Sequence, residues 1–105
     1  MTWRTYNLDI RCHMFKIPKV NVIESDEGFS VKVEMTRLLY TEGLKKLYIA
    51  SEILASPGNI GIWKESIRNW EPPYTHERID EKKRQAIIDH IRRAFHWKGE
   101  SISVT

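Results

Sequence analysis

The chain has 105 residues, 41% of them hydrophobic and 30% charged, which suffices for one hydrophobic core but not for two, so we expect a single domain over residues 1–105. Its longest apolar runs are only a few residues, whereas a membrane-spanning helix needs about 20, so no such helix is expected. The formal net charge of +3 does not by itself indicate nucleic acid or anionic lipid as a partner.

The amino-terminal segment and the single cysteine indicate the compartment. Cys12 alone cannot form an internal disulfide or a multi-cysteine metal site. The segment also lacks the continuous apolar stretch of a secretory signal. We therefore expect a cytoplasmic protein.

The first predicted strand covers residues 6–12, where apolar and polar side chains alternate with the two-residue period of a half-buried strand. An alternative start of the domain at Met14 would make residues 1–13 an appendage. Both interpretations stay open.

The next part of the chain is expected to form a meander of strands. Residues 20–23 are mostly apolar, and the turn Ser25-Asp26-Glu27-Gly28 joins them to residues 29–36, where the two-residue alternation is clearest. Residues 37–41 and 44–50 form two further extended segments around a Glu-Gly turn. Successive hairpins of this kind predict antiparallel pairing.

Prolines then break the chain twice. Pro57-Gly58-Asn59 separates the meander from a short strand that begins at Ile60 and runs out near Ser66. Pro72-Pro73 prevent its simple continuation, because proline cannot donate to a strand ladder and restricts the residue before it. Trp63 and Trp70 are expected to pack in the core. The alternative is that Trp70 and Tyr74, in the loop bordered by the prolines, are exposed anchors for a partner.

The last third changes to a helical period. Asp80 is a candidate N-cap and Gly99 a candidate left-handed stop, with a closing strand around Ile102 and Val104. One apolar helical face holds Ile87, Ile88, Ile91, Ala94 and Phe95. The predicted class is α+β: a mostly antiparallel sheet of about five to seven strands, packed by one C-terminal amphipathic helix and followed by a final strand.

The sequence shows no constellation typical of an enzyme. His90 and His96 are six residues apart on the predicted helix and face different sides, so no metal site is predicted. The glycines are scattered singly and form no phosphate loop. The carboxylate pairs 26–27 and 80–81 lie at predicted turns or caps, where they have an ordinary structural use. We therefore expect no catalysis, no cofactor and no small-molecule substrate.

Charge is unevenly distributed along the chain. Residues 24–34 contain four carboxylates and one lysine, a net charge of −3. Residues 82–98 contain six cations and one aspartate, a net charge of +5. This distribution predicts a molecule with one acidic end and one basic end, that is, two electrostatic ends. Because residues 82–98 are basic, the alternative function is that of a small nucleic-acid-binding protein that uses this helix. The competing interpretation of that helix is an ordinary solvated outer face.

Two segments carry a resemblance to a known family. They are EILASPGNIGIWKESIRNWEPP at residues 52–73 and ERIDEKKRQAIIDHIRRAF at residues 77–95. Together with the earlier Thr-Glu-Gly turn, they resemble the bacterial immunity protein 74 family of polymorphic toxin systems, which include contact-dependent growth inhibition. The resemblance spans roughly residues 20–104 and leaves residues 1–19 outside it, as an extension or an extra strand.

The resemblance implies an immunity protein that binds the C-terminal domain of a cognate bacterial toxin. The toxin is expected to be a nuclease, such as an RNase or tRNase, whose active site or substrate access is blocked without catalysis. Neither a membrane nor direct contact with nucleic acid is expected. An acidic patch that imitates phosphate would fit a basic nuclease cleft. The candidate toxin-binding residues are Glu24, Asp26, Glu27, Glu34 and Tyr74; a solubilising turn is the competing interpretation of the four carboxylates.

Overall fold

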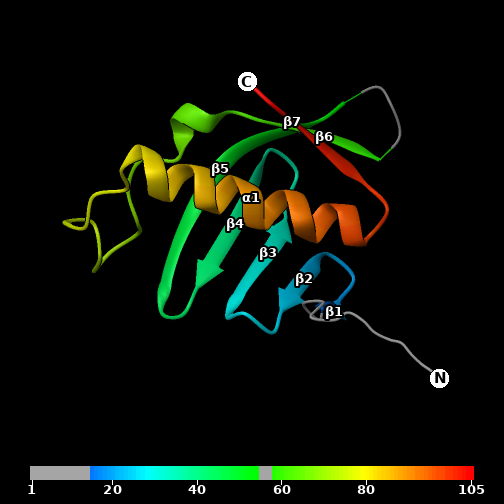
Figure 1. The fold of residues 1–105 in the computed structure, drawn as a ribbon, viewed down its shortest axis with the longest axis horizontal. Coiled ribbons are helices and arrows are strands. Elements are labelled where there is room, and N and C mark those ends of the chain that lie inside the picture. Colours follow the sequence, from blue (N-terminus) through cyan, green and yellow to red (C-terminus); the bar gives the residue numbers. More distant parts are fainter. Residues whose placement is uncertain (1–14, 55–57) are drawn as a thin grey trace.

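The computed structural model describes residues 15–54 and 58–105, which contain a seven-stranded sheet and one long helix (Figure 1). The strands are β1 (Phe15–Lys19), β2 (Val22–Ser25), β3 (Phe29–Val33), β4 (Arg37–Glu42), β5 (Lys45–Ile53), β6 (Asn59–Ile62) and β7 (Ser101–Val104). A short 3-10 helix, η2 (Lys64–Ser66), follows β6, and α1 (Glu81–Trp97) precedes β7. The predicted strand at residues 6–12 lies outside the described residues.

The strands lie in the sheet in the order of the chain, from β1 to β7. Each neighbouring pair from β1 to β6 is antiparallel, as short turns require, whereas β6 and β7 are parallel. A parallel pair needs a long connection, and here η2, the following loop and α1 provide it. The predicted α+β class, with a mostly antiparallel sheet and one C-terminal helix before a final strand, is confirmed.

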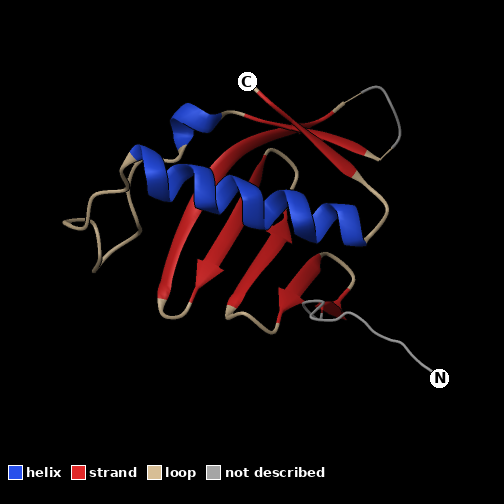
Figure 2. Ribbon diagram, viewed as in Figure 1, coloured by secondary structure: helices blue, strands red, loops and turns tan. Residues whose placement is uncertain are grey.

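The core lies between α1 and the concave face of the curled sheet (Figure 2). Leu38 and Tyr40 from β4 alternate with outward-facing neighbours, and they are fully buried, as is Ile91 of the helix. The apolar helical face is the predicted one: Ile87, Ile88, Ile91, Ala94 and Phe95 are all buried. Each large apolar side chain buried in this way contributes about 1.5–3 kcal/mol. In the part of the chain described, no helix combines the length and apolar character needed to cross a membrane.

Both predicted ends of the helix are confirmed. The Asp80 carboxylate accepts a hydrogen bond of 2.8 Å from the Lys83 backbone N–H, which satisfies a donor left free at the start of the helix. At the other end Gly99 has φ +88°, a conformation that side chains disfavour, and this allows the Glu100 N–H to donate to Phe95 O. The helix therefore ends at Trp97, and residues 98–100 connect it to β7.

Two predicted strands end earlier than the alternation indicated. β3 ends at Val33, and Met35 lies 86% exposed in the turn that follows. β6 ends at Ile62 and not near Ser66, because the Ser66 hydroxyl closes a tight turn by donating to Trp63 O and accepting from the Ala50 N–H. As a result Trp63 is 39% exposed, which contradicts its predicted core position, whereas Trp70 is buried as predicted.

Candidate protein-binding surface

Three of the four acidic residues singled out by the sequence lie at one end of the sheet. Glu24 lies near the end of β2 that leads into the β2–β3 turn, and Asp26 and Glu27 lie in that turn. Glu34 follows β3 and therefore lies at the opposite end of the same hairpin. The structure thus brings Glu24, Asp26 and Glu27 together and separates Glu34 from them.

Ion pairs within the chain engage three of these carboxylates. Glu24 lies 3.2 Å from Lys16 Nζ, Glu27 lies 2.9 Å from Arg93 Nη1, and Glu34 lies 2.7 Å from Arg37 Nε. The hydrogen bond from Arg37 holds the pKa of Glu34 below its ordinary value. Glu24, Glu27 and Glu34 therefore already face cations in the free protein.

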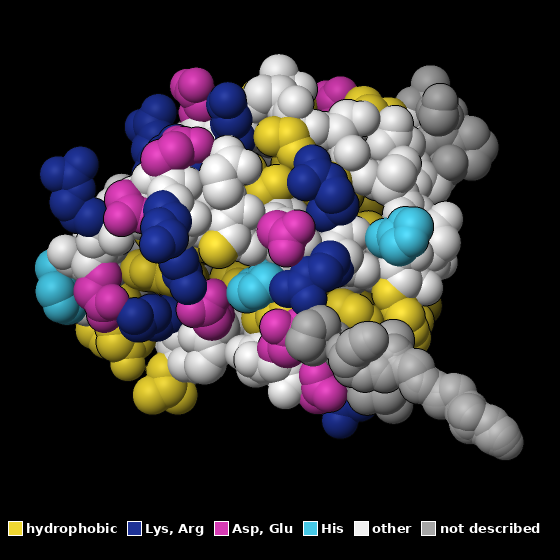
Figure 3. Space-filling model, in the orientation of Figure 1, with side chains coloured by type: hydrophobic (Ala, Val, Ile, Leu, Met, Phe, Trp, Pro, Cys, Tyr) yellow, Lys and Arg dark blue, Asp and Glu magenta, His cyan; other side chains and the backbone are white. Residues whose placement is uncertain are grey.

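The prediction of two electrostatic ends is wrong. Helix α1 packs against β2 and β3, so its basic residues lie beside the acidic hairpin rather than far from it. Figure 3 shows the outcome, with basic and acidic side chains interspersed over the helix-bearing face. Opposite charges attract across this packed interface, which local sequence composition cannot reveal.

Glu27 and Tyr74 line one groove of about 510 Å³ at this end of the sheet. The groove lies between the β2–β3 turn, the β4–β5 turn and the loop that follows Trp70. Its lining residues are Glu27, Gly28, Glu42, Gly43, Leu44, Lys45 and Tyr74. Leu44 is 83% exposed at the tip of the β4–β5 turn, and the Lys45 ammonium lies 5.8 Å from the centre of the Tyr74 ring. An aromatic side chain, an exposed apolar side chain and two carboxylates therefore share one concave surface.

Sequence reasoning identified Glu27 and Tyr74 but missed the other groove residues. Leu44 carried a signal, because a large apolar residue at the tip of a predicted turn has no place in the core. Glu42 and Lys45 carried no such signal, since charged residues commonly flank a turn.

A hydrogen-bonded network that includes Glu42 of the groove joins the sheet to the helix. The Tyr40 hydroxyl donates to Glu42 Oε1 at 2.7 Å and lies 2.7 Å from His90 Nδ1, while Lys83 Nζ donates to Glu42 Oε2 at 2.6 Å. Burial works against ionisation of Glu42, but the hydrogen bonds from Lys83 and Tyr40 outweigh it and hold its pKa below the ordinary value. An ionised Glu42 can only accept hydrogen bonds.

The network fixes the proton positions of its members. Burial raises the pKa of Tyr40, so its phenol stays protonated and gives its one proton to Glu42. Burial, together with the charge of Arg93, lowers the pKa of His90 and favours its neutral form. Because the proton of Tyr40 is already used, His90 must donate from Nδ1 to the Tyr40 oxygen. The His90 ring is held by stacking on Phe29, with 4.3 Å between the ring centres. The network therefore holds the Glu42 carboxylate, which lines the groove, against the helix.

Most cations of helix α1 are also engaged. Within the helix Lys83, Arg84 and Arg93 pair with Glu42, Glu81 and Glu27, respectively, and Lys98, just after the helix, pairs with Glu100. Such pairing competes with phosphate contacts and weakens the nucleic-acid alternative. No group of three or more His, Cys, Asp or Glu side chains suited to a metal ion occurs among the described residues.

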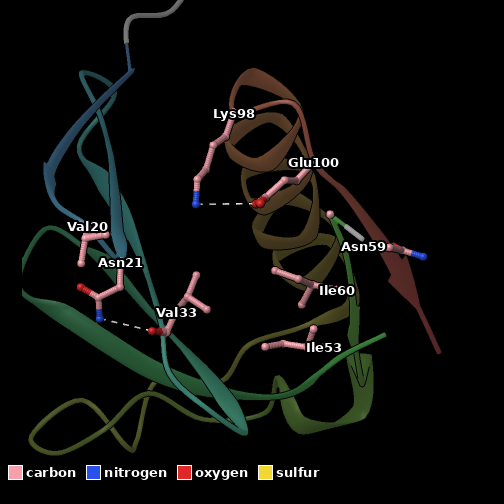
Figure 4. A pocket seen from close by; sticks show the side chains of 9 residues that line it. Val20, Asn21, Val33, Ile53, Asn59, Ile60, Lys98 and Glu100 are labelled. Atoms are coloured by element: carbon pink, nitrogen blue, oxygen red, sulfur yellow. Dashed lines mark hydrogen bonds and ion pairs between the residues drawn. The ribbon is translucent and has the colours of Figure 1, made fainter. Parts of the chain in front are cut away.

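A smaller apolar hollow of about 230 Å³ lies at the opposite end of the sheet (Figure 4). Val20, Val33, Ile53 and Ile60 line it, with Val20 90% and Ile53 73% exposed. The ion pair between Lys98 and Glu100 lies at its rim. These residues come from four separate strands or turns, so no local sequence pattern indicates the hollow. It is a second concave surface, in which four apolar side chains lie beside one ion pair.

Comparison with known proteins identifies a family. A family model described as Immunity protein 74 matches residues 30–105. No curated protein and no solved structure matches the chain. The matched residues include Glu34 and Tyr74, whereas Glu24, Asp26 and Glu27 precede them.

Proposed function

The chain belongs to the Immunity protein 74 family, which implies an immunity protein against a toxin, and from this premise we propose that it binds and neutralises the C-terminal domain of a cognate bacterial toxin. The toxin domain is a nuclease, and the bound protein blocks its active site or its access to RNA. The protein acts as an inhibitor without catalysis, in the cytoplasm of the cell that makes it.

The contact surface in this proposal is the acidic turn and the groove beside it. The single observation that carries it is that Glu27 and Tyr74, 47 positions apart in the printed sequence, line the same concave surface. Tyrosine is favoured at the centres of protein interfaces, because it buries a large area and loses little conformational freedom. Asp26 is exposed in the adjoining turn and Glu24 extends the acidic surface along β2. Glu34 adds a contact only if the toxin reaches along the whole hairpin.

Electrostatic complementarity explains the role of the carboxylates. A nuclease cleft is positively charged because it binds phosphates, so carboxylates on the inhibitor speed the encounter and favour the correct orientation. The internal ion pairs moderate this effect without abolishing it, since Asp26 is in none of the ion pairs found among the described residues. The apolar parts of Tyr74 and Leu44 then hold the complex together.

The test uses the toxin domain encoded beside this gene. Tyr74→Ala is expected to weaken its binding by about 10-fold to 100-fold, mainly through faster dissociation, because it removes a central anchor. Asp26→Asn is expected to slow association and to reduce its dependence on salt. Surface plasmon resonance measures both rates, and Glu52→Gln, at an exposed position of β5, is the matched control for charge loss. Unchanged kinetics in both variants would remove this surface from the interface.

The alternative function, nucleic-acid binding by residues 82–98, has less support. Lys82 and Arg92 are exposed, but four other cations of the segment are paired with carboxylates. A salt-dependent mobility shift with RNA or DNA in the absence of any protein partner would favour this alternative over the toxin complex.

A further inference from the structure

Three arginines converge on a hollow of about 370 Å³ near the start of α1. Its lining residues are Arg68, Asn69, Arg78, Ile79 and Arg84. Arg68 follows η2, Arg78 lies two residues before the N-cap Asp80, and Arg84 lies in the first turn of the helix. No carboxylate is among the lining residues, so this hollow differs from the groove, where acidic and basic side chains are mixed.

The backbone around the hollow is held in place. An antiparallel bridge between Asn69 and Arg78 joins the two loop segments that form its walls. Ile67 and Ile79 are buried beside them and attach these segments to the core. The hollow is therefore a formed feature of the fold and not an accidental gap between loops.

Two of the guanidinium groups are also oriented. Arg84 donates from Nε to Ile67 O at 3.2 Å and from Nη1 to Glu81, and Arg68 donates from Nε to Glu65 O at 2.8 Å. Nitrogen atoms at the ends of both groups remain available. Arg78 has no side-chain hydrogen bond or ion pair with any of residues 15–54 or 58–105. Of these three adjacent arginines only Arg84 is paired with a carboxylate of the described chain, that of Glu81, so the hollow carries a net positive charge that attracts an anion.

The chemistry of guanidinium identifies the ligand class. Its planar, forked donors match the two oxygens of a carboxylate or the oxygens of a phosphate, and several such forks around one hollow reinforce each other. The geometry points to a carboxylate-binding pocket that receives an acidic side chain of the toxin, an inference that rests on the proposed function.

A protein carboxylate fits better than a nucleic acid. Binding of a nucleic-acid backbone needs a row of phosphate contacts along a basic surface. Here Lys83 and Arg93 of α1, and Lys98 just after it, are paired with carboxylates of the chain itself, so the row is interrupted. The remaining isolated hollow is suited to one or two side chains of a partner.

The variant that tests the pocket is Arg68→Gln with Arg78→Gln, which leaves Arg84 and its contacts to the backbone intact. The matched control is Lys82→Gln with Arg92→Gln, which removes the same charge from exposed positions outside the pocket. Thermal unfolding of both variants establishes that each is folded before binding is measured.

Binding of the unaltered protein to the toxin domain from the neighbouring gene is measured first. Absence of that binding would reject the proposed function, whatever the pocket does. If the complex forms, the pocket variant is expected to bind at least about 10-fold more weakly, because charge-assisted hydrogen bonds are lost, and the control to stay within about twofold. Equal losses in both variants, or no loss in the pocket variant, would overturn the inference.

Two further measurements locate the ligand. Acidic residues of the toxin are replaced one at a time by their amides, and one replacement is expected to weaken the complex with the unaltered protein but not with the pocket variant. If no replacement shows this coupling, the carboxylate assignment fails. A short RNA is tested at physiological salt in parallel; binding of RNA that is lost in the pocket variant and kept in the control would assign the pocket to phosphate instead.

Discussion

At the scale of single residues, Tyr40 links the two layers of the fold. Its ring is fully buried, and its hydroxyl contacts Glu42 of the sheet and His90 of the helix. Both partners are half-buried. Removing the hydroxyl therefore leaves two polar groups with one hydrogen bond fewer in a place that water reaches poorly.

We expect Tyr40→Phe to lower the free energy of unfolding by about 1–3 kcal/mol, the usual cost of an unmet hydrogen bond in a protein interior. Urea denaturation followed by fluorescence measures it. Tyr48→Phe is the matched control, because the Tyr48 ring interacts with Arg37 through its face and its hydroxyl has no hydrogen bond to a described residue. Equal losses in the two variants would show that the network contributes nothing specific.

His90 makes stability dependent on pH near neutrality. Its pKa in the folded protein is lowered by burial and Arg93. The unfolded chain therefore binds a proton at a pH where the folded protein does not, and the contribution of His90 is complete above the ordinary histidine pKa of 6.5 and declines as the pH falls below it. Glu42 acts in the same direction at lower pH, since its pKa is also lowered.

The expected result is a free energy of unfolding that decreases from pH 7.5 to about pH 5.5. In His90→Gln the decrease over this interval should be smaller, because Gln does not titrate. Urea denaturation across the pH range provides the measurement, and His96→Gln, at an exposed helix position, serves as the control. A pH profile of His90→Gln parallel to that of the unaltered protein would contradict the assignment.

At the scale of helices and strands, local sequence patterns correctly predicted the turns and helix ends that short-range interactions determine. The Gly28 turn was predicted and has φ +96°, and the Asp80 cap and the Gly99 stop are present. The end of β6 was mispredicted, because it depends on hydrogen bonds between Ser66 and the distant Ala50. The edge strand β1 was not predicted either, since it contains a proline and mostly exposed side chains.

The cap gives a direct test at this scale. Asp80→Ala should lower the free energy of unfolding by about 1 kcal/mol, because the Lys83 N–H loses its acceptor. Asp80→Asn retains an acceptor oxygen and should cost much less, so this pair separates capping from side-chain size. Chemical denaturation followed by circular dichroism measures both. If Asn were as destabilising as Ala, the carboxylate charge and not the cap would be responsible.

At the scale of the whole molecule, the candidate site was only partly predictable. The sequence identified the acidic turn and Tyr74 separately, but only the fold places Glu27 and Tyr74 on one groove. Sequence composition also predicted separated charges, whereas Glu27 and Arg93 form an ion pair across 66 positions of sequence. Long-range pairing of this kind is decided by helix packing on the sheet, which no local pattern encodes.

This ion pair allows structural and functional roles of Glu27 to be separated. Glu27→Arg alone places two arginines together and should destabilise the fold, although by no more than about 1 kcal/mol at this partly exposed site. The exchange Glu27→Arg with Arg93→Glu restores opposite charges and should recover most of that loss, while Asp89 beside residue 93 limits full recovery. Denaturation of the unaltered protein, Glu27→Arg, Arg93→Glu and the exchanged protein gives the coupling between the two positions.

The exchanged protein keeps its net charge and its fold but moves the negative charge from the turn to the helix. If the acidic turn faces the toxin, the exchanged protein should associate with the toxin domain more slowly than the unaltered protein does. The association rate of the exchanged protein should also depend less on salt. Stopped-flow measurements at two ionic strengths test this. A stable exchanged protein that associates at the unaltered rate would show that Glu27 serves only to attach the turn to α1, and the interface would then have to be sought elsewhere on the molecule.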